Sequence, residues 1–177
     1  MKYLVISDIH GSFYYARKIP EIVERENTQK LILLGDLYYH GPRNSLPKDY
    51  APMKVAELLN FYQDQIIAIR GNCDAYVDET ISSFPFHDSY SLDIQGKKFF
   101  FTHGHIYHKK HIPKHVDILV YGHLHTGFIE EHEGVICVNT GSLSLPKNHT
   151  LHSYVVIDEE KISLKDIEGN IILEKYF

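Results

Sequence analysis

Asp8 and His10 stand two residues apart at the end of an apolar run, and they open the set of residues that could do chemistry. Side chains two apart in an extended chain point to the same side, so this carboxylate and imidazole would project together. Imidazole is the commonest metal ligand among side chains, and the chain contains 13 histidines. The pair therefore predicts a metal site if other segments bring donors to the same place.

Four further apolar runs end in residues of the same kind, which gives seven donors in all: Asp8, His10, Asp36, Asn72, His103, His123 and His125. The carboxyl ends of the strands of an open α/β sheet form a shared edge where ligands bind. Seven donors on that edge can hold two metal ions if one carboxylate bridges them. Asp36 is the expected bridge, because it stands alone on its strand between the other donors.

The donor set limits both the metal and the substrate. Carboxylate, amide and imidazole donors without thiolate suit manganese, iron, zinc or nickel. Two divalent cations bring four positive charges, and the carboxylates of Asp8 and Asp36 neutralise only two of them. The excess favours an anion together with a metal-bound hydroxide. Phosphate esters fit, because two metals about 3.5–4 Å apart can stabilise both the attacking and the leaving oxygen.

Helices and strands that would position these donors alternate in the first half of the chain. A helix beginning after Ser12 is interrupted at Pro20, where we expect a kink or a restart, and residues 52–62 are predicted to form another helix. The second half is mostly strands, with a hairpin across 89–102 and short segments at 116–121, 127–131, 134–139, 153–157, 161–167 and 170–176. This succession predicts two packed sheets with helices outside them.

Length, composition and charge bound the remaining possibilities. The 177 residues are expected to form a single domain over 1–177. A net charge of −5 argues against a nucleic-acid partner, since such proteins usually carry a basic surface. Cys73 and Cys137 make no disulfide framework, and no stretch reaches the roughly 20 apolar residues of a membrane span. We expect a cytoplasmic protein without membrane attachment, and the aromatic-rich elements leave a homo-oligomer open.

The motifs resemble, in kind and order, those of the calcineurin-like metallophosphoesterases. They are Asp8-x-His10, Gly35-Asp36, Gly71-Asn72-x-Asp74, Thr102-His103-Gly104 and Gly122-His123-x-His125. Longer segments resemble the bacterial YfcE-type phosphodiesterases at 8–12, 40–44, 70–74 and 102–105. The resemblance implies a four-layer α-β-β-α sandwich of two mixed sheets flanked by helices, with a dinuclear site often occupied by manganese.

The resemblance also implies individual roles. One metal would be held by Asp8, His10, Asp36 and His125, and the second by Asp36, Asn72, His103 and His123. A hydroxide bridging the metals would attack phosphorus in line. The residues implied to be catalytic are Asn72, Cys73, Asp74 and His103, and Arg43 and Asn44 would bind the substrate. Arginine offers a planar fork for phosphate oxygens, although an exposed loop arginine is an equal alternative at Arg43.

Cys73 departs from the broad family, which commonly has a histidine there that is thought to assist the leaving group or bind phosphate. A thiol is a poorer hydrogen-bond donor than imidazolium. We therefore expect a phosphodiesterase that prefers acidic leaving alcohols and is weak toward monoesters and alkyl diesters. The alternative, that Cys73 only fills space, stays open.

These observations predict a metal-dependent phosphodiesterase acting on a small-molecule diester. A phosphomonoesterase or a small nuclease on the same scaffold is the enzymatic alternative. A non-catalytic alternative is an interaction scaffold, because a vacuolar sorting subunit of the retromer coat resembles this fold. All seven motif donors are present in this chain, which favours the enzyme.

Overall fold

Two mixed β-sheets pack face to face in the computed structural model, which describes residues 1–177. The larger sheet has seven strands in the order β12-β11-β10-β1-β2-β3-β4, and its central strands β1, β2 and β3 run parallel. Its members are β1 (Tyr3–Ile6), β2 (Lys30–Leu33), β3 (Ile66–Ile69), β4 (Phe86–His87), β10 (Ser153–Ile157), β11 (Lys161–Asp166) and β12 (Ile171–Tyr176). The smaller sheet has five strands in the order β5-β6-β7-β9-β8, with β6, β7 and β9 parallel. Its members are β5 (Tyr90–Ile94), β6 (Lys97–Phe101), β7 (Ile118–Tyr121), β8 (Gly127–His132) and β9 (Val135–Thr140).

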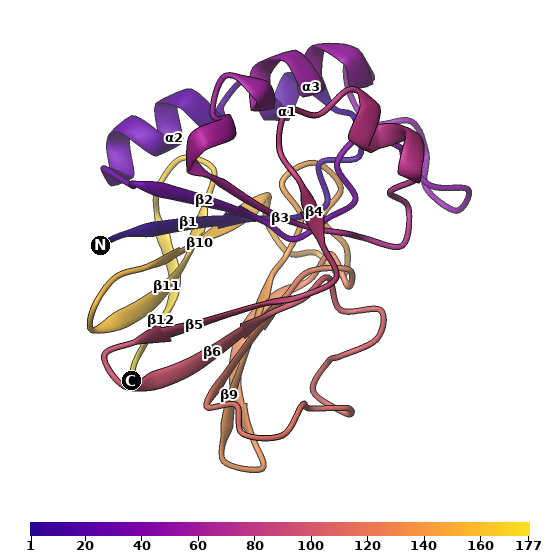
Figure 1. Ribbon diagram of the computed structural model, residues 1–177. Helices are drawn as coiled ribbons and strands as arrows, with labels where there is room; N and C mark the ends of the chain where they lie inside the picture. The colour runs from indigo at the N-terminus through magenta and orange to yellow at the C-terminus, as the bar shows by residue number, and fades with distance from the viewer.

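All three α-helices lie together on the outer face of the larger sheet (Figure 1). They are α1 (Phe13–Ala16), α2 (Ile19–Glu26) and α3 (Pro52–Asn60), and two 3₁₀ helices, η1 (Gln63–Gln65) and η2 (Tyr76–Thr80), complete the set. The restart expected at Pro20 is confirmed, because this proline occupies the first turn of α2, where its missing N–H has no partner to lose.

Alternating side chains of the central strands build two separate cores. In β1, Leu4 and Ile6 face the helices, whereas Val5 faces the second sheet. In β2, Leu31 and Leu33 likewise join the core under the helices, and Ile32 joins the core between the sheets. A strand buried on both faces reads as an unbroken apolar run, as predicted for this segment. These two cores hold the carboxyl ends of the parallel strands in place.

The outer face of the smaller sheet carries no helix, which corrects the fourth layer of the expected sandwich. The connection between β6 and β7 covers part of it, since Ile112 and Val116 pack on Leu119, Tyr121 and Cys137. That connection contains Pro113 and has no helical spacing of apolar residues, so it crosses the sheet as a loop. The expected α/β class and the two mixed sheets are confirmed.

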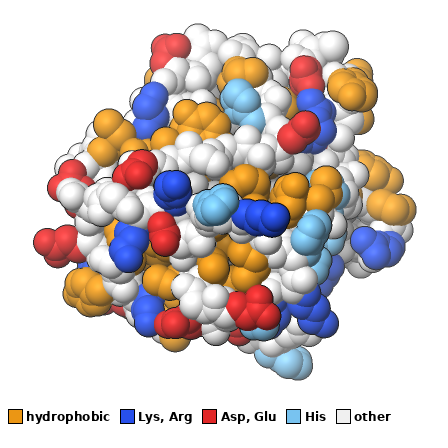
Figure 2. Space-filling view, turned by 60° about the horizontal axis from the view of Figure 1, so that its bottom comes forward, with side chains coloured by type: hydrophobic (Ala, Val, Ile, Leu, Met, Phe, Trp, Pro, Cys, Tyr) orange, Lys and Arg blue, Asp and Glu red, His pale blue; other side chains and the backbone are white.

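Charged side chains of both signs are interspersed on the face that Figure 2 shows. Hydrophobic side chains form small groups there, separated by Lys, Arg, Asp, Glu and His. None of the helices is both long enough and apolar enough to cross a bilayer.

Candidate metal centre and active-site pocket

Backbone hydrogen bonds join the loops that follow β1 and β2 and set their first donors side by side. The N–H of Asp8 donates to the carbonyl of Gly35 (3.1 Å), and the N–H of His10 donates to the carbonyl of Asp36 (2.8 Å). The parallel pairing of the two strands thus continues past their ends. Asp8, His10 and Asp36 are consequently placed by the sheet rather than by free loops.

Left-handed backbone conformations occur at five of the seven donor residues. Their φ angles are 56°, 49°, 54°, 65° and 57° at Asp8, His10, Asp36, His123 and His125. A residue with a Cβ pays about 1–2 kcal/mol for such a conformation, and such outliers cluster at functional sites. The five residues all lie in the loops that follow β1, β2 and β7, so the shared conformation bends these loops at the donors.

A first group of donors consists of Asp8, His10 and His125. Oδ2 of Asp8 accepts hydrogen bonds from the Ser7 hydroxyl (2.6 Å) and the N–H of His123 (2.9 Å). Oδ1 of Asp8 is buried and makes no hydrogen bond. It lies 3.1 Å from Nε2 of His125 and 3.5 Å from Nε2 of His10, and these two nitrogens are 3.2 Å apart. Three donor atoms therefore converge on one point, as a metal ion requires.

A second group of donors consists of His103, His123 and Asn72. Nε2 of His103 lies 3.0 Å from Oδ1 of Asn72 and 3.2 Å from Nδ1 of His123. Asp36 stands between the two groups, because its Oδ2 is 3.6 Å from Nε2 of His10 and 3.5 Å from Nε2 of His103. The other oxygen of Asp36 accepts the N–H of Cys73 (2.8 Å), which fixes the orientation of the carboxylate.

Backbone carbonyls orient three of the four imidazoles. The Nδ1 atoms of His10, His103 and His125 lie 2.8, 2.6 and 2.7 Å from the carbonyl oxygens of Tyr39, Leu34 and Leu145. A ring nitrogen that donates to a carbonyl carries the proton, so in the neutral ring Nε2 keeps its lone pair. Metal-binding histidines almost always show this pattern. Together with the unpartnered oxygen of Asp8, it makes the site fit for divalent cations.

Two serines tie a third loop to the first. The hydroxyls of Ser142 and Ser144 donate to the carbonyl of Asp8 at 2.7 and 3.0 Å, and Ser144 also reaches the carbonyl of Ile9 at 2.8 Å. This loop also supplies the Leu145 carbonyl that orients His125. The turn at Ser142 thus supports the donors from beneath.

Glycine is required where backbone meets a donor carboxylate. A Cβ on Gly71 would collide with Oδ1 of Asp36, and a Cβ on Gly122 would collide with Ser7 and with Oδ2 of Asp8. The glycines of the Gly-Asn and Gly-His motifs are thus explained by close approach.

Opposite charges in the buried site shift the pKa values of its members. Burial alone would raise the pKa of Asp8, but the imidazoles of His10 and His125 beside its carboxylate outweigh it and hold that pKa well below the usual range. Burial disfavours the imidazolium of His103, yet the hydrogen bond and charge of Asp36 raise its pKa to about 9. For His123, burial and the positive charge of His103 lower the pKa to about 4. The metal-free site therefore holds its carboxylates ionised beside a protonated His103.

Metal uptake should consequently release a proton from His103. A metal ligand must be the neutral imidazole, whereas the metal-free ring stays protonated up to pH about 9. Apparent metal affinity should therefore rise about tenfold per pH unit for each released proton between pH 7 and 9. Calorimetry in buffers of different ionisation enthalpy measures the protons released. Uptake at pH 7 without proton release, or an affinity independent of pH, would contradict this charge distribution.

Asp74 was expected to be catalytic, but its carboxylate accepts hydrogen bonds from three backbone N–H groups. Oδ2 accepts the N–H groups of Asp36 (2.8 Å) and Gly71 (2.7 Å), and Oδ1 accepts that of Leu37 (2.8 Å). Burial and the charge of Asp36 raise the pKa of Asp74 to about 6, against the lowering effect of these hydrogen bonds. Asp74 is therefore inferred to be a positioning residue that holds the Asp36 loop.

Asp74→Asn should destabilise the metal-free protein by about 1–3 kcal/mol, because the amide nitrogen would face a buried N–H and leave it unpaired. Metal affinity should fall as well, since the loop that carries Asp36 would move. Chemical denaturation and metal titration measure the two effects. Asp78→Asn is the matched control, because Asp78 accepts one exposed N–H, from Ala75, which the amide oxygen can still accept. Equal stability of both variants would remove the positioning role.

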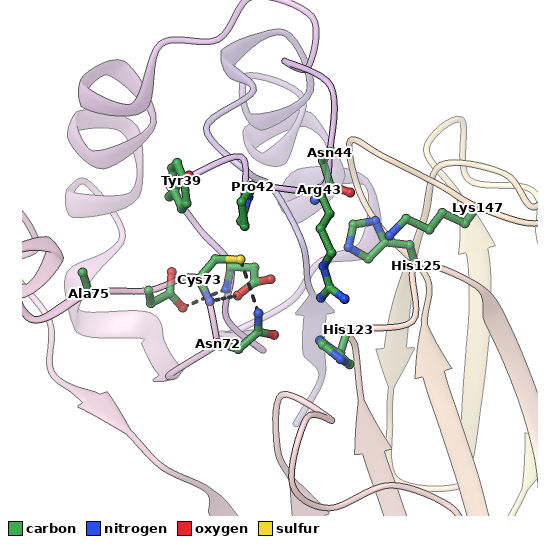
Figure 3. Close-up of a pocket in the computed structure, with 13 residues that line it drawn as sticks. Tyr39, Pro42, Arg43, Asn44, Asn72, Cys73, Ala75, His123, His125 and Lys147 are labelled. Carbon is green, nitrogen blue, oxygen red and sulfur yellow. Dashed lines mark hydrogen bonds between the residues drawn. The ribbon is translucent and has the colours of Figure 1, made fainter.

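A cavity of about 430 Å³ opens directly over the donors, within the size range of small-molecule sites (about 300–1,000 Å³). Its lining includes Arg43, Asn44, Asn72, Cys73 and Lys147. In Figure 3 the guanidinium of Arg43 extends into the space between Cys73 and His125. The structure thus brings the expected substrate-binding residues to the metal donors, and it adds Lys147, which no sequence motif indicated.

Cys73 also faces this cavity. Its Sγ lies within 4.8 Å of donor atoms of His10 and Asp36. Burial and the nearby carboxylates, Asp36 first, raise the pKa of the thiol to about 12, so it remains a weak, uncharged donor at neutral pH.

Comparison with known proteins decides the family. The calcineurin-like phosphoesterase superfamily domain matches residues 1–161. The chain belongs to this family. It is 39% identical to phosphodiesterase YfcE of Escherichia coli strain K12 over 98% of this chain and 96% of that protein. It is 28% identical to phosphodiesterase MJ0936 of Methanocaldococcus jannaschii, over 80% of this chain and 83% of that protein.

Two solved structures resemble this chain, and the first agrees with the family membership. The structure of the E. coli phosphoesterase YfcE superimposes with a TM-score of 0.95 at 36% identity, covering 99% of both chains. Vacuolar protein sorting 29 of Cryptosporidium parvum gives a TM-score of 0.65 at 17% identity, covering 99% of this chain and 98% of that one. At that identity the second match shows a common fold alone.

Proposed function

We propose that this metallophosphoesterase is a dinuclear, metal-dependent phosphodiesterase acting on small-molecule diesters. The observation that carries the proposal is the place of Asp36, whose Oδ2 lies about equally far from Nε2 of His10 and of His103. One carboxylate oxygen shared by two groups of donors suits a bridge between two cations. The name of the 39% identical relative, a phosphodiesterase, supports the reaction class.

Residues of the chain would divide between two ions. Asp8, His10 and His125 would complete one site with Asp36, and Asn72, His103 and His123 would complete the other. Oxygen and nitrogen donors without thiolate suit manganese, zinc, iron or nickel. The resemblance to the family makes manganese the first candidate. When bound, two such ions would lower the pKa of a shared water for in-line attack on phosphorus and neutralise charge on the phosphate oxygens.

The chain's own side chains would handle the substrate around the metals. Asn72 would stabilise negative charge that develops on the phosphoryl oxygens through its amide N–H group. His103 lies 3.0 Å from Asn72, and its other ring nitrogen faces the Leu34 carbonyl, so it would act on that charge through the ion it holds. Arg43 and Asn44 would orient the ester group that does not react. Cys73 offers no acid for the departing alcohol, because its thiol is a weak donor, so diesters with acidic leaving alcohols should react fastest.

The scaffold alternative has one supporting observation, the shared fold with vacuolar protein sorting 29. One feature weighs against it. The donors lie together and three of their four imidazole rings are oriented by backbone carbonyls, which an interaction scaffold does not need.

A metal-by-substrate matrix tests the proposal. Protein freed of metal by chelation is reconstituted with manganese, zinc, iron or nickel and assayed on monoesters, diesters and a nucleic-acid panel. We expect diester hydrolysis to return with metal and to exceed monoester hydrolysis. Fastest cleavage of monoesters or of nucleic acid would favour the enzymatic alternatives. Protein that binds metal but hydrolyses no ester would favour the scaffold.

A further inference from the structure

Arg43 and Lys147 are the two cationic side chains that line the active-site cavity. Neither forms a salt bridge or a side-chain hydrogen bond with the rest of the chain, whereas Lys109, Lys161 and other lysines are paired with carboxylates. The lining contains only two carboxylates, Asp36 and Asp74, and both are buried beneath the cavity. Unpaired positive charge therefore borders the cavity in a protein whose net charge is −5.

Lys147 is tied to a metal-donor loop by its backbone. Its N–H donates to the carbonyl of His125 (2.8 Å). Its own carbonyl accepts the N–H of Thr150 (3.1 Å) and the Thr150 hydroxyl (2.8 Å). In Figure 3 the Lys147 side chain lies beside the His125 ring. The backbone of Lys147 is thus fixed next to the donor loop, and its exposed side chain lies at the edge of the cavity.

Arg43 is held on a neighbouring wall of the cavity. The Asn44 amide donates to the carbonyl of His40 (2.8 Å), which closes the loop around Arg43, and Pro42 restricts the backbone just before it. Figure 3 shows the two cationic side chains reaching toward the cavity from different loops. A ligand above the metal donors would meet both.

The positive charges around the cavity indicate that its ligand carries more than one negative charge. The scissile group of a phosphodiester bears one negative charge. Two divalent ions carry four positive charges, and Asp8 and Asp36 neutralise two of them. The two positive charges that remain at the metal site already exceed the charge of the scissile group. Arg43 and Lys147 add two more at the rim. Charge-assisted hydrogen bonds to these cations are strong only if the ligand brings an anionic group to them.

We propose that Lys147, together with Arg43, binds a second anionic group on the substrate, so that the preferred diester carries a carboxylate or phosphate on its non-reacting arm. This inference rests on the proposed phosphodiesterase function and names its substrate class. Neutral alkyl or aryl arms would leave both cations without a partner.

Matched substrates test the inference. 4-Nitrophenyl propyl phosphate, 4-nitrophenyl 2-carboxyethyl phosphate and the corresponding 2-phosphoethyl diester share one leaving group and differ in the charge of the other arm. We expect kcat/KM to be about tenfold higher for a charged arm than for propyl, chiefly through KM. The carboxylate and phosphate arms show which anion is preferred. Equal kcat/KM for all three substrates would overturn the inference.

Lys147→Gln should reduce the ratio of kcat/KM between charged and neutral arms about tenfold, and Lys147→Arg should restore most of it. Lys97→Gln is the control, because Lys97 is exposed at the start of β6, the end opposite His103, and makes no salt bridge. An unchanged ratio in Lys147→Gln would remove Lys147 from substrate recognition.

Binding separates this inference from the proposed function. Calorimetry with metal-loaded protein compares 3-phosphonopropionate, which carries a carboxylate, with propylphosphonate, which does not. We expect the first to bind about tenfold more tightly to the wild type and to lose that advantage in Lys147→Gln. Selective binding without hydrolysis of any diester would support the anion site and refute the phosphodiesterase. Hydrolysis without arm selectivity in rate or binding would do the reverse.

Discussion

Asp36→Asn should lower metal affinity at both positions at once and abolish most of the activity. Its Oδ2 lies between Nε2 of His10 and Nε2 of His103, so both groups of donors lose their shared anionic ligand. Changes in residues that merely support a ligand cost about 10–100-fold in metal affinity or activity, and losing a shared ligand should exceed that range. Metal content by elemental analysis and kcat/KM on a diester check the result.

Asp64→Asn is the matched control for this experiment. Asp64 is exposed in η1, and its carboxylate makes no hydrogen bond, so the variant should keep full metal content and rate. Loss of one metal per chain from Asp36→Asn, with the second retained at wild-type affinity, would show that Asp36 serves one ion only. Retained stoichiometry and rate would contradict the bridging assignment.

Cys73→His should accelerate hydrolysis selectively for diesters with poor leaving groups. The thiol faces the cavity and, with a pKa raised to about 12 by burial and nearby carboxylates, supplies no effective acid. An imidazolium at this position could protonate the departing alkoxide, and general acids typically contribute about 10²–10⁴-fold. We expect a gain of about 10–100-fold for alkyl leaving groups and little change for nitrophenol, because nitrophenolate leaves without a proton.

A plot of kcat/KM against the pKa of the leaving alcohol measures this selectivity. The slope should become shallower in Cys73→His and stay unchanged in Cys73→Ser, whose hydroxyl is also uncharged. A uniform gain across the series would mean that histidine assists substrate binding rather than departure of the alcohol. If Cys73→His increased kcat/KM for none of the diesters, we would conclude that Cys73 only fills space.

The sequence predicted the members of the candidate metal site from two local signals. An apolar run shows where a strand ends, and the residue type that follows shows which ligand it can offer. A buried apolar run followed by Asp8 or Asp36 indicates a strand that stops at the sheet edge, and parallel pairing brings such edges together. The prediction that Asp36 lies between the other donors required only its order along the chain. The structure brings together the donors that the motifs identify, with Asn72 beside His103, and it places Cys73 next to them.

Other features depend on tertiary contacts that no local pattern records. Asp and His tolerate the left-handed backbone better than most residues, but which of them adopt it, such as Asp8 and His123, depends on contacts between distant loops. Asp74 follows a catalytic motif but turns toward backbone N–H groups. The backbone of Lys147 is positioned by a hydrogen bond to the carbonyl of His125, which belongs to a different loop. The expected outer helical layer was wrong, because a loop packs there instead.

Anomalous diffraction from crystals of the manganese-loaded protein tests most directly whether the seven donors around Asp36 bind two cations. We expect two anomalous peaks, one on each side of the Asp36 carboxylate, the first within bonding distance of Asp8 and the second within bonding distance of His103. A single peak, or peaks away from Asp36, would contradict the dinuclear centre.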